Sequence, residues 1–161
     1  MLKQLLILLC LIIIKPAIAD TLHDNFSAGV HQLMDFYDND SGLWRDNNCI
    51  RGGSCQADAK HGFLYWANIE RLLADYQVLT NESANEKNMY QTMRKNKSNL
   101  INAAYFDDAG WWALAFLAAY KATDDVSYLH EAEDIANNIT TRGAQYVCGK
   151  GGIYWDADKT Q

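Results

Sequence analysis

Apolar residues recur at helical spacing along most of this chain, and its one proline lies near the N-terminus. The clearest stretch spans 63–79, where one broad face is apolar. Its members are Phe63, Leu64, Trp66, Ala67, Ile69, Leu72, Leu73, Tyr76 and Leu79. Spacing of three and four residues is typical of an amphipathic helix that buries one side. The pattern predicts a helix over 59–79, with Glu70, Arg71 and Asp75 mostly on the opposite face.

Four further segments show the same periodicity and are joined by short connections rich in Asn, Asp, Ser and Gly. They predict helices over 24–37, 84–101, 108–121 and 126–141. No stretch shows convincing alternation with period two, the sign of a half-buried strand. Short links between amphipathic helices favour antiparallel neighbours. The sequence therefore predicts an all-α protein, built as an array of antiparallel helical hairpins.

The N-terminus has the features of a secretory signal peptide. Lys3 precedes an unbroken apolar run, Leu5–Ile14, and an Ala-Ile-Ala motif follows at 17–19. The run is too short to span a bilayer, and cleavage is expected directly behind the motif. We therefore expect residues 1–19 to be a signal peptide. Residues 20–161 would form one domain without a membrane span, secreted or associated with the cell wall.

The chain is acidic. Its net charge of −6 changes to −8 once the leader is removed, because the leader holds two lysines and no acid. This balance argues against nucleic acid and anionic membrane surfaces as partners, since both require clustered Lys and Arg. A neutral or cationic ligand fits the charge better.

Cysteine placement agrees with export. Cys49 and Cys55 flank a glycine-containing loop that can close as a small disulfide in an oxidising compartment. Cys148 is left over, either as a buried free thiol or with a partner outside this chain. The histidines show no metal-ligand spacing with cysteines or acids; they are His23, His31, His61 and His130. We therefore expect no metal site.

Two adjacent carboxylates, Asp107 and Asp108, stand directly before Trp111 and Trp112 at the head of an apolar run. Asp is favoured at a helix start, where it accepts hydrogen bonds from free N–H groups and complements the helix dipole, so the pair can be structural. Alternatively the pair is catalytic, because a retaining glycosidase holds two carboxyl groups only ~5 Å apart. The tryptophans likewise either pack in the core or line a cleft beside the carboxylates.

The run YFDDAGWWALAFLAAY and the later segment GGIYWD, with SGLW and YWANIERLLADYQVLT upstream, resemble glycoside hydrolase family 76, the endo-acting α-1,6-mannanases. The resemblance implies an (α/α)6 barrel, retaining cleavage of α-1,6-mannan and no cofactor. Carried over by position, it implies that Asp107 is the nucleophile and Asp108 the general acid/base. A twelve-helix barrel needs roughly twice this chain at ordinary helix lengths. We therefore expect about half a barrel, with apolar faces left for self-association or a missing C-terminal half.

Side chains that can stack on or bind sugar rings complete the candidate substrate-binding set. They are Trp44, Trp66, Asn68, Trp111, Trp112, Tyr154 and Trp155. Taken singly, each fits a core or loop-anchor role at least as well. Family members commonly have two tryptophans where this chain has Tyr154 and Trp155, a change that would alter a subsite and leave the chemistry intact. A second aspartate pair, Asp124 and Asp125, is not followed by tryptophans and is predicted to be a turn and helix cap.

Two other functions stay open. A catalytically inactive helical protein that binds mannan or another carbohydrate at the cell wall would keep the cleft without turnover. A different (α/α) toroid enzyme, such as an unsaturated uronyl hydrolase or a sugar epimerase, fits less well. Acidic substrates require cationic residues around the site, and the chain is acidic.

Overall fold

The computed structural model describes residues 21–45, 63–145 and 151–159. Several expectations concern residues outside this part of the chain, namely the signal peptide, the disulfide, the leftover cysteine and one histidine. These residues are 1–19, Cys49, Cys55, His61 and Cys148. The chain divides into two compact units, Met1–Phe36 and Tyr37–Gln161.

The described part of the first unit is a helix over 21–34. Its position agrees with the helix predicted at 24–37, but it ends earlier. Tyr37 pairs in a strand instead, so the predicted C-terminal boundary is wrong. Helix ends are the least reliable part of any periodicity argument, because fraying residues keep the apolar pattern.

The second unit begins with a small antiparallel hairpin of β1 (Tyr37–Asp38) and β2 (Leu43–Trp44). The carboxylate of Asp38 accepts a hydrogen bond of 2.7 Å from the Ser41 hydroxyl and closes the turn. Gly42 has φ +72, a conformation that residues with side chains rarely adopt. The expectation of no strands is therefore wrong here. The turn residues bring β1 and β2 together, and a strand of two residues is too short to show apolar and polar alternation in the sequence.

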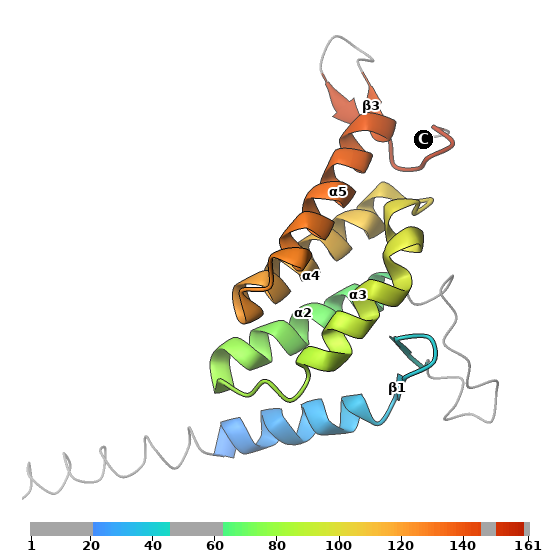
Figure 1. The fold of residues 1–161 in the computed structure, drawn as a ribbon. Helices are drawn as coiled ribbons and strands as arrows, with labels where there is room; N and C mark the ends of the chain where they lie inside the picture. Colours follow the sequence, from blue (N-terminus) through green and yellow to red (C-terminus); the bar gives the residue numbers. More distant parts are fainter. Residues whose placement is uncertain (1–20, 46–62, 146–150, 160–161) are drawn as a thin grey trace, which may run out of the picture. The chain divides into compact units, whose positions relative to one another are not determined.

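Four helices follow, close to their predicted bounds: α2 (Phe63–Thr80), α3 (Glu86–Ile101), α4 (Phe106–Thr123) and α5 (Val126–Gly143). The helix α4 packs along α2 and also along α5 (Figure 1). Buried alanines on α2 and α4 let the two helix backbones approach closely. They are Ala67, Ala74, Ala109, Ala115 and Ala119. The large buried side chains fill the remaining space and include Trp66, Leu73, Trp112, Phe116 and Ile135.

Glu70 lies in the core, and its predicted place on the polar face of α2 is wrong. Its side chain is 0% exposed. It follows Trp66 by four residues and precedes Leu73 by three, so it belongs to the face that packs inward. Neither carboxyl oxygen has a hydrogen-bond partner among the described residues. Burial raises the pKa of this carboxyl well above its ordinary value.

Polar contacts tie α3 to the hairpin and to α5. The ammonium group of Lys95 donates to the carbonyl oxygen of Asp40 at 2.9 Å. On the other side, Lys97 forms an ion pair of 2.5 Å with Glu131, whose side chain is 2% exposed. The helix α3 is thereby fixed between two parts of the second unit that are distant in sequence.

The turn between α4 and α5 confirms the structural prediction for the second aspartate pair. Asp124 has φ 56 in the left-handed region and ends α4. Asp125 begins α5, and its Oδ1 accepts a hydrogen bond of 2.9 Å from the backbone N–H of Ser127. This is the expected geometry of a helix N-cap.

After α5 the chain forms a second small antiparallel pair, β3 (Ala144–Gln145) and β4 (Gly152–Ile153). The residues that follow return to the start of α4, where Asp156 pairs with Tyr105 in an isolated bridge. Within the described part of the chain, no helix combines the length and apolar character needed to cross a membrane.

Candidate active site

The aspartate pair lies in the first turn of α4. The helix begins at Phe106, so Asp107 and Asp108 are helical residues and Tyr105 is the N-cap. The side chain of Tyr105 makes no capping hydrogen bond. Instead, Oδ1 of Asp107 accepts from the backbone N–H of Asp108 at 3.0 Å. The free N–H groups and the dipole of a helix N-terminus favour negative charge at this place.

The two carboxylates have different surroundings. Asp107 is exposed, whereas Asp108 is partly buried. Burial, and then the negative charge of Asp107, raise the pKa of Asp108 above its ordinary value of 3.8. Two carboxyl groups whose environments differ in this way suit different roles, one as a carboxylate and one as a proton donor.

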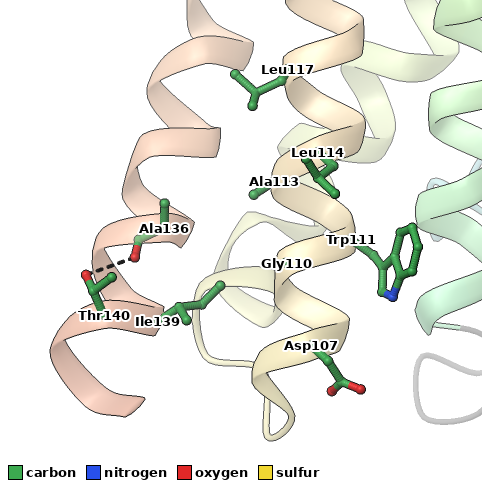
Figure 2. Close-up of a pocket in the computed structure, with 9 residues that line it drawn as sticks. All are labelled: Asp107, Gly110, Trp111, Ala113, Leu114, Leu117, Ala136, Ile139 and Thr140. Carbon is green, nitrogen blue, oxygen red and sulfur yellow. Dashed lines mark hydrogen bonds between the residues drawn. The ribbon is translucent and has the colours of Figure 1, made fainter. Parts of the chain in front are cut away.

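Asp107 is one of the residues that line a groove along α4 and α5, with a volume of ≈ 520 Å³ (Figure 2). Asp107 and Trp111 project from the same side of α4, one helical turn apart. Trp111 is 40% exposed. The groove is otherwise lined by small or apolar residues and one threonine: Gly110, Ala113, Leu114, Leu117, Ala136, Ile139 and Thr140.

A second pocket of ≈ 340 Å³ also has Asp107 in its lining. It is lined by Phe106, Asp107, Ile139, Ile153, Tyr154 and Trp155. Asp107 and Ile139 line both spaces, so the two are neighbours. The ring of Trp155 is 46% exposed and lies 4.8 Å from that of Tyr105, centroid to centroid. Asp107 therefore lines two neighbouring spaces, each of which also has aromatic lining residues.

The structure brings four of the predicted site residues to these two pockets: Asp107 and Trp111 line the groove, and Asp107, Tyr154 and Trp155 line the second pocket. Asp108 lines neither pocket and is the next residue of α4 after Asp107. The other four lie elsewhere. Trp44, Trp66 and Trp112 are buried at 1%, 3% and 0% exposure. Asn68 is exposed and donates to the Leu64 carbonyl of its own helix at 2.9 Å. A sugar-binding role for these four residues stays a prediction.

Several lining residues were not singled out from the sequence. Leu114 follows Asp107 by seven residues and therefore shares its helix face, so spacing alone could have found it. Ile139 could not have been found in this way. It comes from α5, and only the packing of α5 on α4 places it beside Asp107.

The described residues contain no cluster of three or more His, Cys, Asp or Glu side chains that could hold a metal ion.

Several known proteins are similar to this chain. The sequence profile described as glycosyl hydrolase family 76 matches residues 21–161. No curated protein sequence matches the chain significantly. Among solved structures, the GH76A α-1,6-mannanase of Salegentibacter sp. HEL1_6 is 23% identical with a TM-score of 0.67. The match covers 86% of this chain and 38% of that chain.

An inactive variant of the same mannanase, with two adjacent aspartates replaced by asparagine, was solved in complex with α-1,6-mannotriose. It is 20% identical, with a TM-score of 0.67 and coverage of 86% and 38%. The Lin0763 protein from Listeria innocua is 22% identical, with a TM-score of 0.60 and coverage of 83% and 39%. The chain spans well under half the length of these structures. Their similarity confirms the predicted (α/α)-barrel type of helical array, present here as part of a barrel.

Proposed function

The chain belongs to glycosyl hydrolase family 76, and from this membership we propose that it is an exported glycosidase that cleaves α-1,6-mannan with retention of configuration. The observation that carries the proposal is the Asp107–Asp108 pair at the N-terminus of α4, beside a groove with an exposed tryptophan. Replacement of two adjacent aspartates in the similar Salegentibacter mannanase gives an inactive variant that binds α-1,6-mannotriose. That fact supports the proposal.

In the first step the Asp107 carboxylate attacks the anomeric carbon, and the bond from that carbon to the glycosidic oxygen breaks. Asp108 gives its proton to the departing oxygen. The exposure of Asp107 at the groove favours the first role. The raised pKa of Asp108, caused by burial and by the charge of Asp107, favours the second because it makes this carboxyl group the one of the pair that holds its proton more tightly.

In the second step water enters, and the Asp108 carboxylate takes one of its protons. The water oxygen bonds to the anomeric carbon and releases Asp107. Two inversions at the same carbon give net retention. Trp111 in the groove, and Tyr154 and Trp155 in the neighbouring pocket, offer ring faces on which sugar units can stack.

The test uses the chain from Asp20 onward with linear α-1,6-mannan, and products are followed by mass. Wild-type protein should release mannooligosaccharides, and Asp107→Asn and Asp108→Asn should not. Asp124→Asn is the matched control, because it changes the other aspartate pair of the chain. If all four proteins behave alike while folded, the assignment of the pair is wrong.

Azide distinguishes the two roles. With Asp107→Ala, azide attacks the α-linked substrate directly, and a β-mannosyl azide is the expected product. With Asp108→Ala, azide intercepts the glycosyl intermediate on Asp107, and an α-mannosyl azide should form instead. The opposite pattern of products would exchange the roles of the two residues.

A second candidate function is mannan binding without turnover. It is favoured by the exposed ring of Trp111 at the groove, because stacking of a ring on a sugar requires no catalytic pair. Calorimetric titration with α-1,6-mannotriose decides between the candidates. Binding that Trp111→Ala weakens, with no product over long incubation, would support a binding protein and exclude catalysis by this chain.

A further inference from the structure

Gly143 is the last residue of α5, and its backbone does not explain why it is a glycine. Glycine at a helix end usually adopts a left-handed conformation that side chains disfavour. Among the described glycines, only Gly42 has positive φ. The residue that caps α5 is Ala144, with φ −60 and ψ 135. Any amino acid can adopt the backbone conformation at position 143, so the reason for the glycine must be steric and lie in the atoms around it.

A side chain at position 143 would collide with two neighbours. A Cβ atom built there lies 2.8 Å from Cγ2 of Ile153 and 2.9 Å from Cε2 of Phe106. Real Cβ atoms essentially never come this close to other atoms. The same construction at Gly29, Gly110 or Gly151 meets nothing within 4 Å. The close approach is therefore a property of this position and not of glycines in general.

The residues that converge on Gly143 also hold the start of α4. The carbonyl of Gly143 accepts from the N–H of Tyr154 at 2.9 Å. The next residue, Trp155, offers its carbonyl to the N–H of Phe106, also at 2.9 Å. This N–H belongs to the first helical residue and has no partner inside α4. The backbone of the 152–157 segment thus supplies the cap that no side chain provides.

Two further contacts fix the same place. The N–H of Ala157 donates to the carbonyl of Ala104 at 2.8 Å. The Phe106 ring is 4% exposed and lies under the guanidinium group of Arg142, 5.6 Å from the ring centroid. Asp107 follows Phe106 directly, so a shift of the Phe106 ring moves the backbone that carries the aspartate pair.

We propose that Gly143 is a positioning residue for the aspartate pair. Its missing side chain lets Phe106 and the 152–157 segment close on the end of α5, and this closure sets where α4 begins. The inference deepens the proposed function and rests on it for its catalytic meaning. The geometric part, that position 143 controls the surroundings of Asp108, can be tested without any activity.

The experiment compares wild type, Gly143→Ala and Gly29→Ala by carbon NMR titration of the aspartate carboxyl groups. Gly29→Ala is the matched control, because it adds the same methyl group to a helical glycine with open space around it. We expect Gly143→Ala to displace Phe106 and expose Asp108. Its pKa should then fall from the raised wild-type value toward 3.8. Gly29→Ala should leave the titration unchanged.

A merely structural role would lower the melting temperature of Gly143→Ala without changing the titration of Asp108. An unchanged Asp108 titration in folded Gly143→Ala therefore overturns the proposal. If the variant does not fold, hydrogen exchange of the Phe106 amide in the wild type decides the question. Slow exchange supports capping by Trp155, and exchange at the rate of an exposed amide overturns it.

Kinetics with α-1,6-mannan separate this proposal from the proposed function. If the chain is a mannanase, Gly143→Ala should lower kcat on the order of 100-fold, as expected for a misplaced catalytic group, and change KM much less. If Asp107→Asn has no effect on activity, the proposed function fails. A shifted Asp108 titration in Gly143→Ala would then still establish the positioning role.

Discussion

Burial of Glu70 predicts that the second unit becomes less stable as the pH rises. The carboxyl group is completely buried, and burial alone raises its pKa well above the ordinary 4.5. A group with a higher pKa in the folded than in the unfolded chain holds its proton more tightly when folded. Below pH 4.5 both states are protonated and there is no penalty. Above it, the unfolded chain gains stability by releasing the proton, until the pH reaches the folded pKa.

The size of the effect follows from linkage. Each pH unit inside this window lowers the free energy of unfolding by about 1.4 kcal/mol. Two units would remove nearly 3 kcal/mol, a large share of the roughly 5–15 kcal/mol that stabilises an ordinary domain. The charge of Glu70 interacts electrostatically with the hydroxyl groups of Tyr37 and Tyr128. Neither hydroxyl carries a positive charge that could offset the cost of ionising a buried Glu70 carboxyl.

The assay is urea unfolding followed by tryptophan fluorescence between pH 4.5 and 6.5, on wild type and Glu70→Gln. Glutamine has nearly the same shape but does not titrate in this range. The difference between the two stabilities should therefore change with pH, by up to about 1.4 kcal/mol per pH unit where the unfolded carboxyl is ionised and the folded one is protonated. Glu133→Gln makes the same chemical change at an exposed position and should not alter the wild-type slope. Parallel curves for wild type and Glu70→Gln would refute the reasoning.

Three further substitutions have expected outcomes in the same unfolding assay. Lys97→Met leaves the buried Glu131 carboxylate without its ammonium partner and should lower the free energy of unfolding by about 1–2 kcal/mol, because Lys97 itself is half exposed. Asp125→Ala removes the N-cap of α5 and should cost about 1 kcal/mol. Gly110→Ala adds a methyl group where nothing lies within 4 Å, and should stabilise α4 by about 0.5–1 kcal/mol. The same methyl group enters the groove beside Asp107, so calorimetry should show weaker binding of α-1,6-mannotriose.

The helices and the aspartate pair could be predicted because their signals are local. Helical periodicity located the four helices in the described part of the second unit, since an apolar stripe is visible without knowledge of its partner. Asp125 could be assigned as a cap for the same reason, because its hydrogen bond reaches only two residues along the chain. The aspartate pair was identified by its sequence context, and its place in the first turn of α4 agrees with that context.

Features that depend on contacts distant in sequence could not be predicted. Glu70 has the spacing of the inward face of α2, but a charged residue was expected on the solvent side, and only the packing around α2 shows that its carboxyl group is completely buried. The short strands β3 and β4 form where the chain comes back to the start of α4. No apolar periodicity in the sequence predicts this contact. Gly143 looks like an ordinary helix-ending glycine in the sequence. Only the distances to Ile153 and Phe106 show that there is no room for a side chain at position 143.

The contacts that place the aspartate pair all come from one stretch of this chain. The carbonyl of Trp155, the bridge between Tyr105 and Asp156, the bond from Ala157 to Ala104 and the close approach at Gly143 lie within residues 104–157. Sugar units further from the cleavage point are a different matter, because their binding energy also contributes to kcat through the transition state. A folded chain with slow turnover but a raised Asp108 pKa would therefore have its pair correctly placed and lack distant sugar contacts. A folded chain with slow turnover and an ordinary Asp108 pKa would have lost the placement itself. The titration of this one carboxyl group separates a deficit in substrate binding from a deficit in the catalytic pair.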